Sequence, residues 1–214
     1  MLFVNPEDVI NHARSEHHLE VHKVEDFRNM NNQYHLIEQV VEDYQESYIT
    51  ESSLSGLTAG IGGVATSAAL SGMDLISFSI RLYRLAQQCA ILNGFEGEDP
   101  AEKEQMLDIY FEALGLNAVA QATLKPHFLK ASAVAGTKQA SQSLLLKLIV
   151  QTAKLLGKNI SSRSAGRLIP VVGGLIGASL NHSFARKTSS SLKQAYKNEY
   201  FKRWYGGVTV IEAK

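Results

Sequence analysis

The sequence predicts an all-α protein, a multi-helix bundle in which two glycine-rich helical segments pack together. Three observations lead to this prediction. Apolar residues mostly recur at spacings of three and four, with little of the alternation that strands show. Only four prolines interrupt the 214 residues. With 45% hydrophobic residues, the chain can also bury a substantial core.

The first helix is expected to begin near Pro6. Asn5 can cap it, proline suits its first position, and acids follow in the first turn, where the helix dipole favours them. A long second helix is expected over residues 24–49. Its apolar stripe has spacings of three and four and comprises Phe27, Met30, Tyr34, Ile37, Val41, Tyr44 and Tyr48.

Histidines cluster near the N-terminus, at His12, His17, His18 and His22. His18 and His22 stand four apart, as two zinc ligands on a helix would. The zinc-protease motif requires a glutamate directly after the first histidine, and Leu19 occupies that position. We therefore predict an exposed polar face here and no metal site.

Two small-residue segments have the same spacing. Gly56, Gly60, Gly63 and Ser67 are separated by four, three and four residues, and Gly166, Pro170, Gly173 and Gly177 repeat that spacing 110 positions later. Small residues on one helix face allow another backbone to approach closely. We therefore expect the two segments to touch, with Gly56, Gly60, Gly63, Gly166, Gly173 and Gly177 as packing residues.

A central helix is expected over residues 74–92, because this stretch is apolar nearly all round. Arg81 and Arg84 lie three apart on it and are expected to be buried and paired with carboxylates, Asp74 being one possible partner. An anion site for a phosphate or lipid headgroup is the alternative.

The remaining helices follow from local signals. Asp99 and Pro100 start one that should reach about Leu116. A short helix or helix pair over residues 117–135 should be interrupted near Pro126. A further helix covers residues 142–156, and Gly157 is expected to end it.

Charge is strongly segregated along a chain of zero net charge. Residues 1–51 carry −8, residues 52–129 carry −4 and residues 130–205 carry +12. Acidic and basic helices could pack against each other, or the basic part could face an anionic partner. The residues that could bind an anion or lipid headgroup are Arg81, Arg84, Arg163, Arg167, Arg186, Lys187, Lys193, Lys197 and Arg203.

Aromatic residues accompany the last basic residues, with Leu192, Tyr196, Tyr200 and Trp204 each four apart. Such a helix suits the interface of an anionic membrane. Neither glycine-rich segment is apolar enough to favour stable insertion, so we expect peripheral membrane contact, with insertion and a soluble bundle as the alternatives. Cys89 is the only cysteine and no signal peptide precedes it, which favours the cytoplasm.

No enzyme motif is complete. Gly60, Gly62 and Ala65 match a dinucleotide-binding pattern, but no strand precedes them. Ser190 and Lys193 form an SxxK pair without its companion motifs. We therefore predict no catalytic residue, no cofactor and no metal, and we regard nucleic acid as an improbable partner.

Two sequence blocks carry a family resemblance. IRLYRLAQQCAILNGFEGEDP spans residues 80–100, and GRLIPVVGGLIGASLNHSFARK spans residues 166–187. In these blocks the chain resembles the EcsC family of mostly bacterial proteins. The resemblance implies a non-catalytic, membrane-associated accessory role linked to ABC transport or secretion. A soluble helical enzyme or a ligand-binding protein with an unrecognised site is the alternative.

The resemblance also suggests a division of the chain. Acidic, family-variable helices would form residues 1–51, an EcsC-like helical core would form residues 52–205, and residues 206–214 would be a C-terminal tail. The partner would be an anionic membrane surface or a membrane protein.

Overall fold

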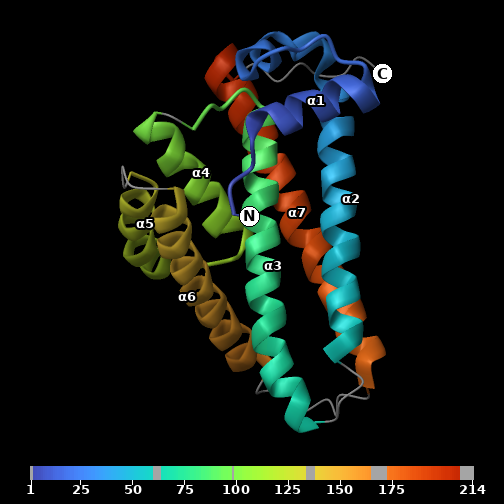
Figure 1. Cartoon of the computed structure of the whole chain (residues 1–214), viewed down its shortest axis with the longest axis vertical. Coiled ribbons are helices and arrows are strands. Elements are labelled where there is room, and N and C mark those ends of the chain that lie inside the picture. Colours follow the sequence, from blue (N-terminus) through green and yellow to red (C-terminus); the bar gives the residue numbers. More distant parts are fainter. Residues whose placement is uncertain (1, 60–63, 98, 134–137, 165–172, 208–214) are drawn as a thin grey trace.

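The computed structural model describes residues 2–59, 64–97, 99–133, 138–164 and 173–207. Over these ranges the chain is helical and forms no strand, so the all-α prediction is confirmed (Figure 1). The α-helices are α1 (Pro6–His17), α2 (Tyr34–Ala59), α3 (Val64–Leu92), α4 (Pro100–Ala113), α5 (Ala118–Ala133), α6 (Lys138–Ser164) and α7 (Gly173–Tyr205), with 3-10 turns η1 (Val24–Asn29) and η2 (Asn31–Gln33) before α2.

Helix α3 occupies the centre of the bundle. It packs against α2, α6 and α7, and α2 packs along α7. Figure 1 shows α4, α5 and α6 on one side of α3 and the α2/α7 pair on the other, with α1 lying across one end of the long helices. The N-terminal segment descends from α1 along the face of α3, towards α4.

The two helix starts that carry proline are confirmed. The Asn5 side chain accepts a hydrogen bond from the Glu7 N–H at 3.3 Å, and Pro6 is the first residue of α1. Asp99 likewise accepts from the Ala101 N–H at 3.1 Å, directly before Pro100 in α4. These caps involve neighbouring residues alone, which is why a sequence pattern can predict them.

The single helix expected over residues 24–49 is wrong in its first third. That stretch forms the two 3-10 turns, and the α-helix begins only at Tyr34. The Asp26 carboxylate accepts hydrogen bonds from the backbone N–H groups of His22 and Lys23, which favours a tight turn there. The apolar stripe nevertheless continues across the change, since Phe27 and Ile37 are both fully buried.

Two expected helix breaks do not occur. α5 continues through Pro126, where both Pro126 and Ala122 are exposed, so water can solvate the carbonyl that proline leaves without a partner. α6 continues through Gly157 to Ser164. A glycine costs about 1 kcal/mol in a helix interior, which is too little to end a helix that packs along α3.

The glycine-rich contact remains a prediction. Gly56 lies near the end of α2, and Gly173 and Gly177 lie in the first turns of α7, but the surroundings of their side-chain positions are outside the described residues. Gly60, Gly63 and Gly166 lie wholly outside them.

One hydrophobic core joins the first fifty residues to the rest. Val9 and Ile10 of α1 and Ile37 and Val41 of α2 belong to the same buried cluster as residues of α3, α4 and α7. Helix α2 also runs through residue 51 without a break. The acidic N-terminal helices are therefore packed into the bundle that the later helices form.

Candidate functional site

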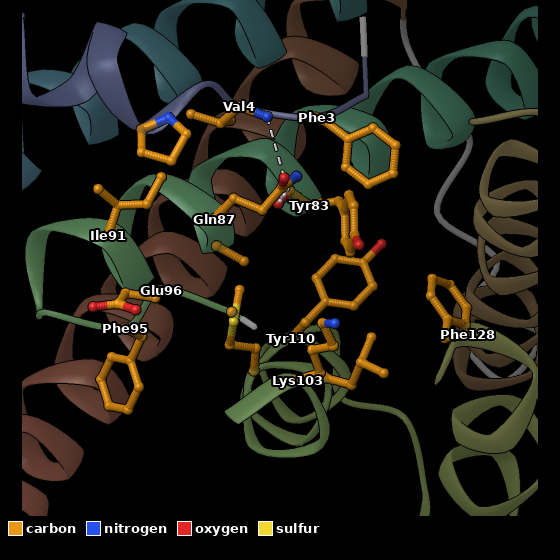
Figure 2. Close-up of a pocket in the computed structure, with 15 residues that line it drawn as sticks. Phe3, Val4, Tyr83, Gln87, Ile91, Phe95, Glu96, Lys103, Tyr110 and Phe128 are labelled. Atoms are coloured by element: carbon orange, nitrogen blue, oxygen red, sulfur yellow. Dashed lines mark hydrogen bonds between the residues drawn. The ribbon is translucent and has the colours of Figure 1, made fainter. Parts of the chain in front are cut away.

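A cavity of about 300 Å³ lies where the N-terminal segment crosses α3, α4 and α5. We call it the strap pocket, because Phe3, Val4 and Pro6 of that segment form its outer wall. Its lining is mainly apolar and aromatic, and Figure 2 shows these side chains converging from several elements. A mostly apolar cavity with a few polar groups is the usual form of a small-molecule site.

Gln87 of α3 holds the N-terminal segment in place. Its side-chain oxygen accepts a hydrogen bond from the Val4 N–H at 3.2 Å (Figure 2). Its side-chain nitrogen donates to the Leu2 carbonyl at 2.9 Å and to the Tyr83 carbonyl at 3.2 Å. The amide is thus fully used in positioning the wall.

Three aromatic rings form the inner wall. Tyr83 of α3 meets Tyr110 of α4 edge to face at 5.3 Å between ring centroids, and Phe128 of α5 lies 6.2 Å from Tyr83. Such geometries stabilise aromatic clusters. The Tyr110 hydroxyl donates to the Ser79 carbonyl at 3.1 Å. Burial raises the pKa of Tyr83 to about 12 and that of Tyr110 well above its ordinary value, so both hydroxyls are protonated at neutral pH.

Two charged residues, Glu96 and Lys103, belong to the lining of the pocket. Glu96 accepts a hydrogen bond from the Arg28 guanidinium at 3.0 Å and is thereby paired. Lys103 of α4 also lines the pocket and is half-buried, but its side chain has no hydrogen bond or ion pair among the described residues. It is therefore the cation of this site that is available to an incoming anion.

The basic residues near the C-terminus are largely neutralised by acids. Lys193 of α7 lies 2.6 Å from a Glu42 carboxylate oxygen, and Lys197 lies 3.1 Å from Glu38. Arg203 contacts the buried carboxylate of Glu102 at 3.1 Å. The structure thus favours acidic and basic helices packing against each other, the first of the two interpretations of the charge segregation.

The aromatic residues of α7 are part of the core. Tyr196 and Tyr200 are fully buried, as is Leu192. The Tyr200 hydroxyl donates to the Phe27 carbonyl at 3.0 Å, and the Trp204 indole donates to the Asn93 carbonyl at 2.9 Å. The expectation that this stripe anchors the chain in lipid is wrong for the buried residues, because they pack against α2 and α3 instead.

The other predicted cations fall into three groups. Arg81 is half-buried and paired with Glu51 at 3.2 Å, so the expected pairing with a carboxylate is found but with less burial, and the side chain of Asp74 lies outside the described residues. Arg84 is half-buried as well. Arg186 and Lys187 are exposed, without an ion pair in the described ranges, whereas the side chains of Arg163 and Arg167 fall outside those ranges.

A surface that the sequence did not single out lies on α6. Leu144 and Leu146 are 41% and 40% exposed, and Lys147 and, two turns further along the helix, Lys154 are exposed as well. The helix contains no acidic residue. We call this set the α6 basic face.

Within the described ranges, no helix combines the length and hydropathy needed to cross a membrane.

One group of potential metal ligands comes together among the described residues, namely His12, His17 and Asp43. His12 and His17 belong to the histidine cluster of the sequence, but only His18 and His22 have the spacing of two ligands on one helix. The third residue here comes from another helix, which no local pattern reveals.

Fold and site together define an all-α protein with an apolar pocket closed by its own N-terminal segment. The chain belongs to the EcsC protein family, whose model matches residues 6–204. The match includes all of α1 and α2, which lie outside the two blocks that first indicated the family. No curated protein and no solved structure gives a significant match to the chain.

Proposed function

We propose that this EcsC-family protein binds a small amphipathic anion in the strap pocket and does not convert it chemically. The observation that carries the proposal is the pairing of an apolar, aromatic cavity with Lys103, a cation that no described carboxylate neutralises. The volume of about 300 Å³ is at the lower end for ligand sites, which suits an aromatic or medium-chain carboxylate.

The polar groups of the pocket are suited to binding and poorly suited to proton transfer. Tyr83 and Tyr110 hold their protons at neutral pH, so neither is a base there. Gln87 is occupied by the N-terminal segment. A carboxylate at Lys103 would gain a charge-assisted hydrogen bond, and its apolar body would be removed from water against the aromatic wall.

Decanoate and decanol, titrated by calorimetry, provide the test. We expect Lys103→Gln to weaken decanoate binding by about tenfold or more, because a hydrogen bond to a charged group contributes about 1.5–3 kcal/mol. Decanol binding should not change. Lys147→Gln, which removes an exposed lysine of α6, is the matched control and should leave both ligands unaffected.

Ala86→Leu is a second variant that tests the pocket itself. Ala86 lines the cavity and is buried, so leucine would occupy ligand volume and should weaken both decanoate and decanol. The proposal is refuted if the unmodified protein binds neither ligand at millimolar concentration, or if Lys103→Gln and Lys147→Gln have equal effects.

A second function is favoured by the α6 basic face. We propose that it contacts anionic membranes peripherally at their cytoplasmic surface, where the accessory role implied by the family resemblance would be exercised. Exposed leucines beside lysines could insert shallowly while the lysines meet headgroups. Twelve basic residues and no acidic residue occur between positions 113 and 198, which gives this part of the chain a uniform sign.

Vesicle sedimentation with neutral and anionic lipids tests this contact. Each lysine near an anionic surface contributes about 1 kcal/mol, so Lys147→Gln with Lys154→Gln should weaken binding roughly thirtyfold. The control is Lys193→Gln with Lys197→Gln, which removes the same charge from residues already paired with Glu42 and Glu38. Binding that ignores lipid charge and salt, or equal loss in both double variants, would exclude the α6 basic face.

A further inference from the structure

His12 and His17 of α1 meet Asp43 of α2 where the first helix crosses the second. His17 Nε2 lies 2.7 Å from Asp43 Oδ2, and His12 Nε2 lies 3.9 Å from the same oxygen. The three ligand atoms lie within 4.8 Å of one another. We call these residues the His–Asp cluster.

The two histidines differ in the hydrogen-bond partners of their Nε2 atoms. His17 has Asp43 as a close hydrogen-bond partner. His12 Nε2 is enclosed, yet it has no hydrogen-bond partner among the residues that the structure describes. Its ring is held by Tyr44 at 4.9 Å and by the His17 ring at 5.7 Å between centroids. An enclosed polar atom without a partner calls for an explanation, and an absent ion is one.

We propose that the His–Asp cluster binds a divalent first-row transition metal ion, with Zn²⁺ as the reference ion. Two imidazoles and a carboxylate are ligands that such ions accept. Bonds of about 2.0–2.2 Å in a tetrahedron place ligand atoms about 3.3 Å apart. The present separations bracket that value, so side-chain movements of about 1 Å would close the site around an ion.

The surroundings supply the fourth position and a favourable charge. An open hollow of about 560 Å³ adjoins His12 and Asp43 and is also lined by Glu46 and Glu51. A water molecule in this hollow would be the fourth ligand. Residues 1–51 carry eleven acidic and three basic side chains, which attracts a cation to this part of the chain.

Metal binding would fasten α1 to α2. All three ligands are present only when α1 lies across α2, so the ion binds the folded arrangement and stabilises it by mass action. The ligands are distinct from the strap pocket, because the His–Asp cluster shares no residue with that lining.

Titration of the tag-free full chain with Zn²⁺ in the presence of a chelating indicator tests the site. We expect one ion per chain and a rise in melting temperature, and Co²⁺ should give the absorption bands of a tetrahedral nitrogen and oxygen site. His12→Gln and Asp43→Asn should each weaken Zn²⁺ binding by about 10- to 100-fold or more.

His22→Gln is the matched control, since His22 is exposed and its side chain is remote from the cluster's three ligand atoms. The His22→Gln variant should retain the Zn²⁺ affinity of the unmodified chain and the same rise in melting temperature on Zn²⁺ binding. Mg²⁺, which prefers oxygen ligands, should have no effect. Equal weakening in His22→Gln and His12→Gln, or no stoichiometric Zn²⁺ binding by the unmodified chain, would overturn the proposal.

Discussion

Replacement of Gly94 by alanine should destabilise the fold through two separable effects. Gly94 follows the C-terminus of α3 and has φ +81°, which allows the Phe95 N–H to bond the Ala90 carbonyl at 3.0 Å. An L-residue in this left-handed region costs about 1–2 kcal/mol. A Cβ would also lie 2.5 Å from Cγ of Arg28, near the base of that side chain.

The second effect comes from Arg28. To make room, it would have to leave a position in which Nε donates to the Gly94 carbonyl at 2.8 Å, the guanidinium pairs with Glu96 at 3.0 Å, and its charge lies 4.5 Å from the Trp204 ring centre. Because both ionic partners are about a third exposed, we assign about 1–2 kcal/mol to these contacts together. Gly94→Ala should therefore cost about 2–4 kcal/mol.

Gly115→Ala isolates the backbone effect. Gly115 has φ +69°, but a Cβ there would meet no atom within 4 Å, so its replacement should cost only about 1–2 kcal/mol. Urea unfolding followed by circular dichroism measures both variants. In an Arg28→Ala background the excess cost of Gly94→Ala should disappear. A Gly94→Ala variant that is no less stable than Gly115→Ala would refute the steric argument.

Three further outcomes are expected. Glu102→Ala should cost about 3 kcal/mol or more of unfolding free energy, because the buried Glu102 carboxylate accepts hydrogen bonds from the Glu96 and Gly97 N–H groups and from Arg203. The control is Glu104→Ala, an exposed change in the same helix, which should cost under about 1 kcal/mol. Urea unfolding measures both. Tyr34→Phe should cost about 1–3 kcal/mol by the same measurement, since it leaves the Asn93 side-chain oxygen without the buried hydroxyl that donates to it at 2.9 Å; an unchanged midpoint would contradict this. Burial raises the pKa of the Cys89 thiol to about 12, so the unfolded chain loses this proton at lower pH than the folded one. The contribution of Cys89 to stability should be constant below about pH 8.5 and be lost as pH rises towards 12, and Cys89→Ala should reduce the slope of stability against pH over that range.

Local signals predicted the parts of the fold that depend on neighbours in sequence. The caps at Asn5 and Asp99 and the end of α3 at Leu92 involve residues a few positions apart, and all three are found. The break expected at Pro126 and the stop expected at Gly157 were wrong for the opposite reason. Exposure of Pro126 in α5 and tertiary packing of α6 around Gly157 outweigh the helix-breaking preference of these two residues, which amounts to a few kcal/mol or less.

The sites depend on residues that the chain brings together from a distance. The strap pocket needs the N-terminal segment, α3, α4 and α5 at once, and no spacing in any of them indicates Gln87 or Lys103. Charge segregation left two alternatives, packing of acidic against basic helices or contact with an anionic partner. It could not distinguish a contact within the chain from one with a membrane, because that depends on which lysines have partners. Lys193 is paired with Glu42, whereas Lys147 has no acidic partner among the described residues.

The association of α2 with α7 has a consequence for how the chain acquires its structure during synthesis. Lys193 and Glu42 are 151 positions apart, and the Tyr200 hydroxyl reaches a carbonyl 173 positions earlier. A ribosome must therefore release nearly all of the chain before α2 can meet its main neighbour. Until then α2 can pack against α3, but the part of its apolar stripe that α7 covers stays exposed to water. The negative charge at the start of the chain would thus also delay premature association, and the positive charge of the last helix would end that delay.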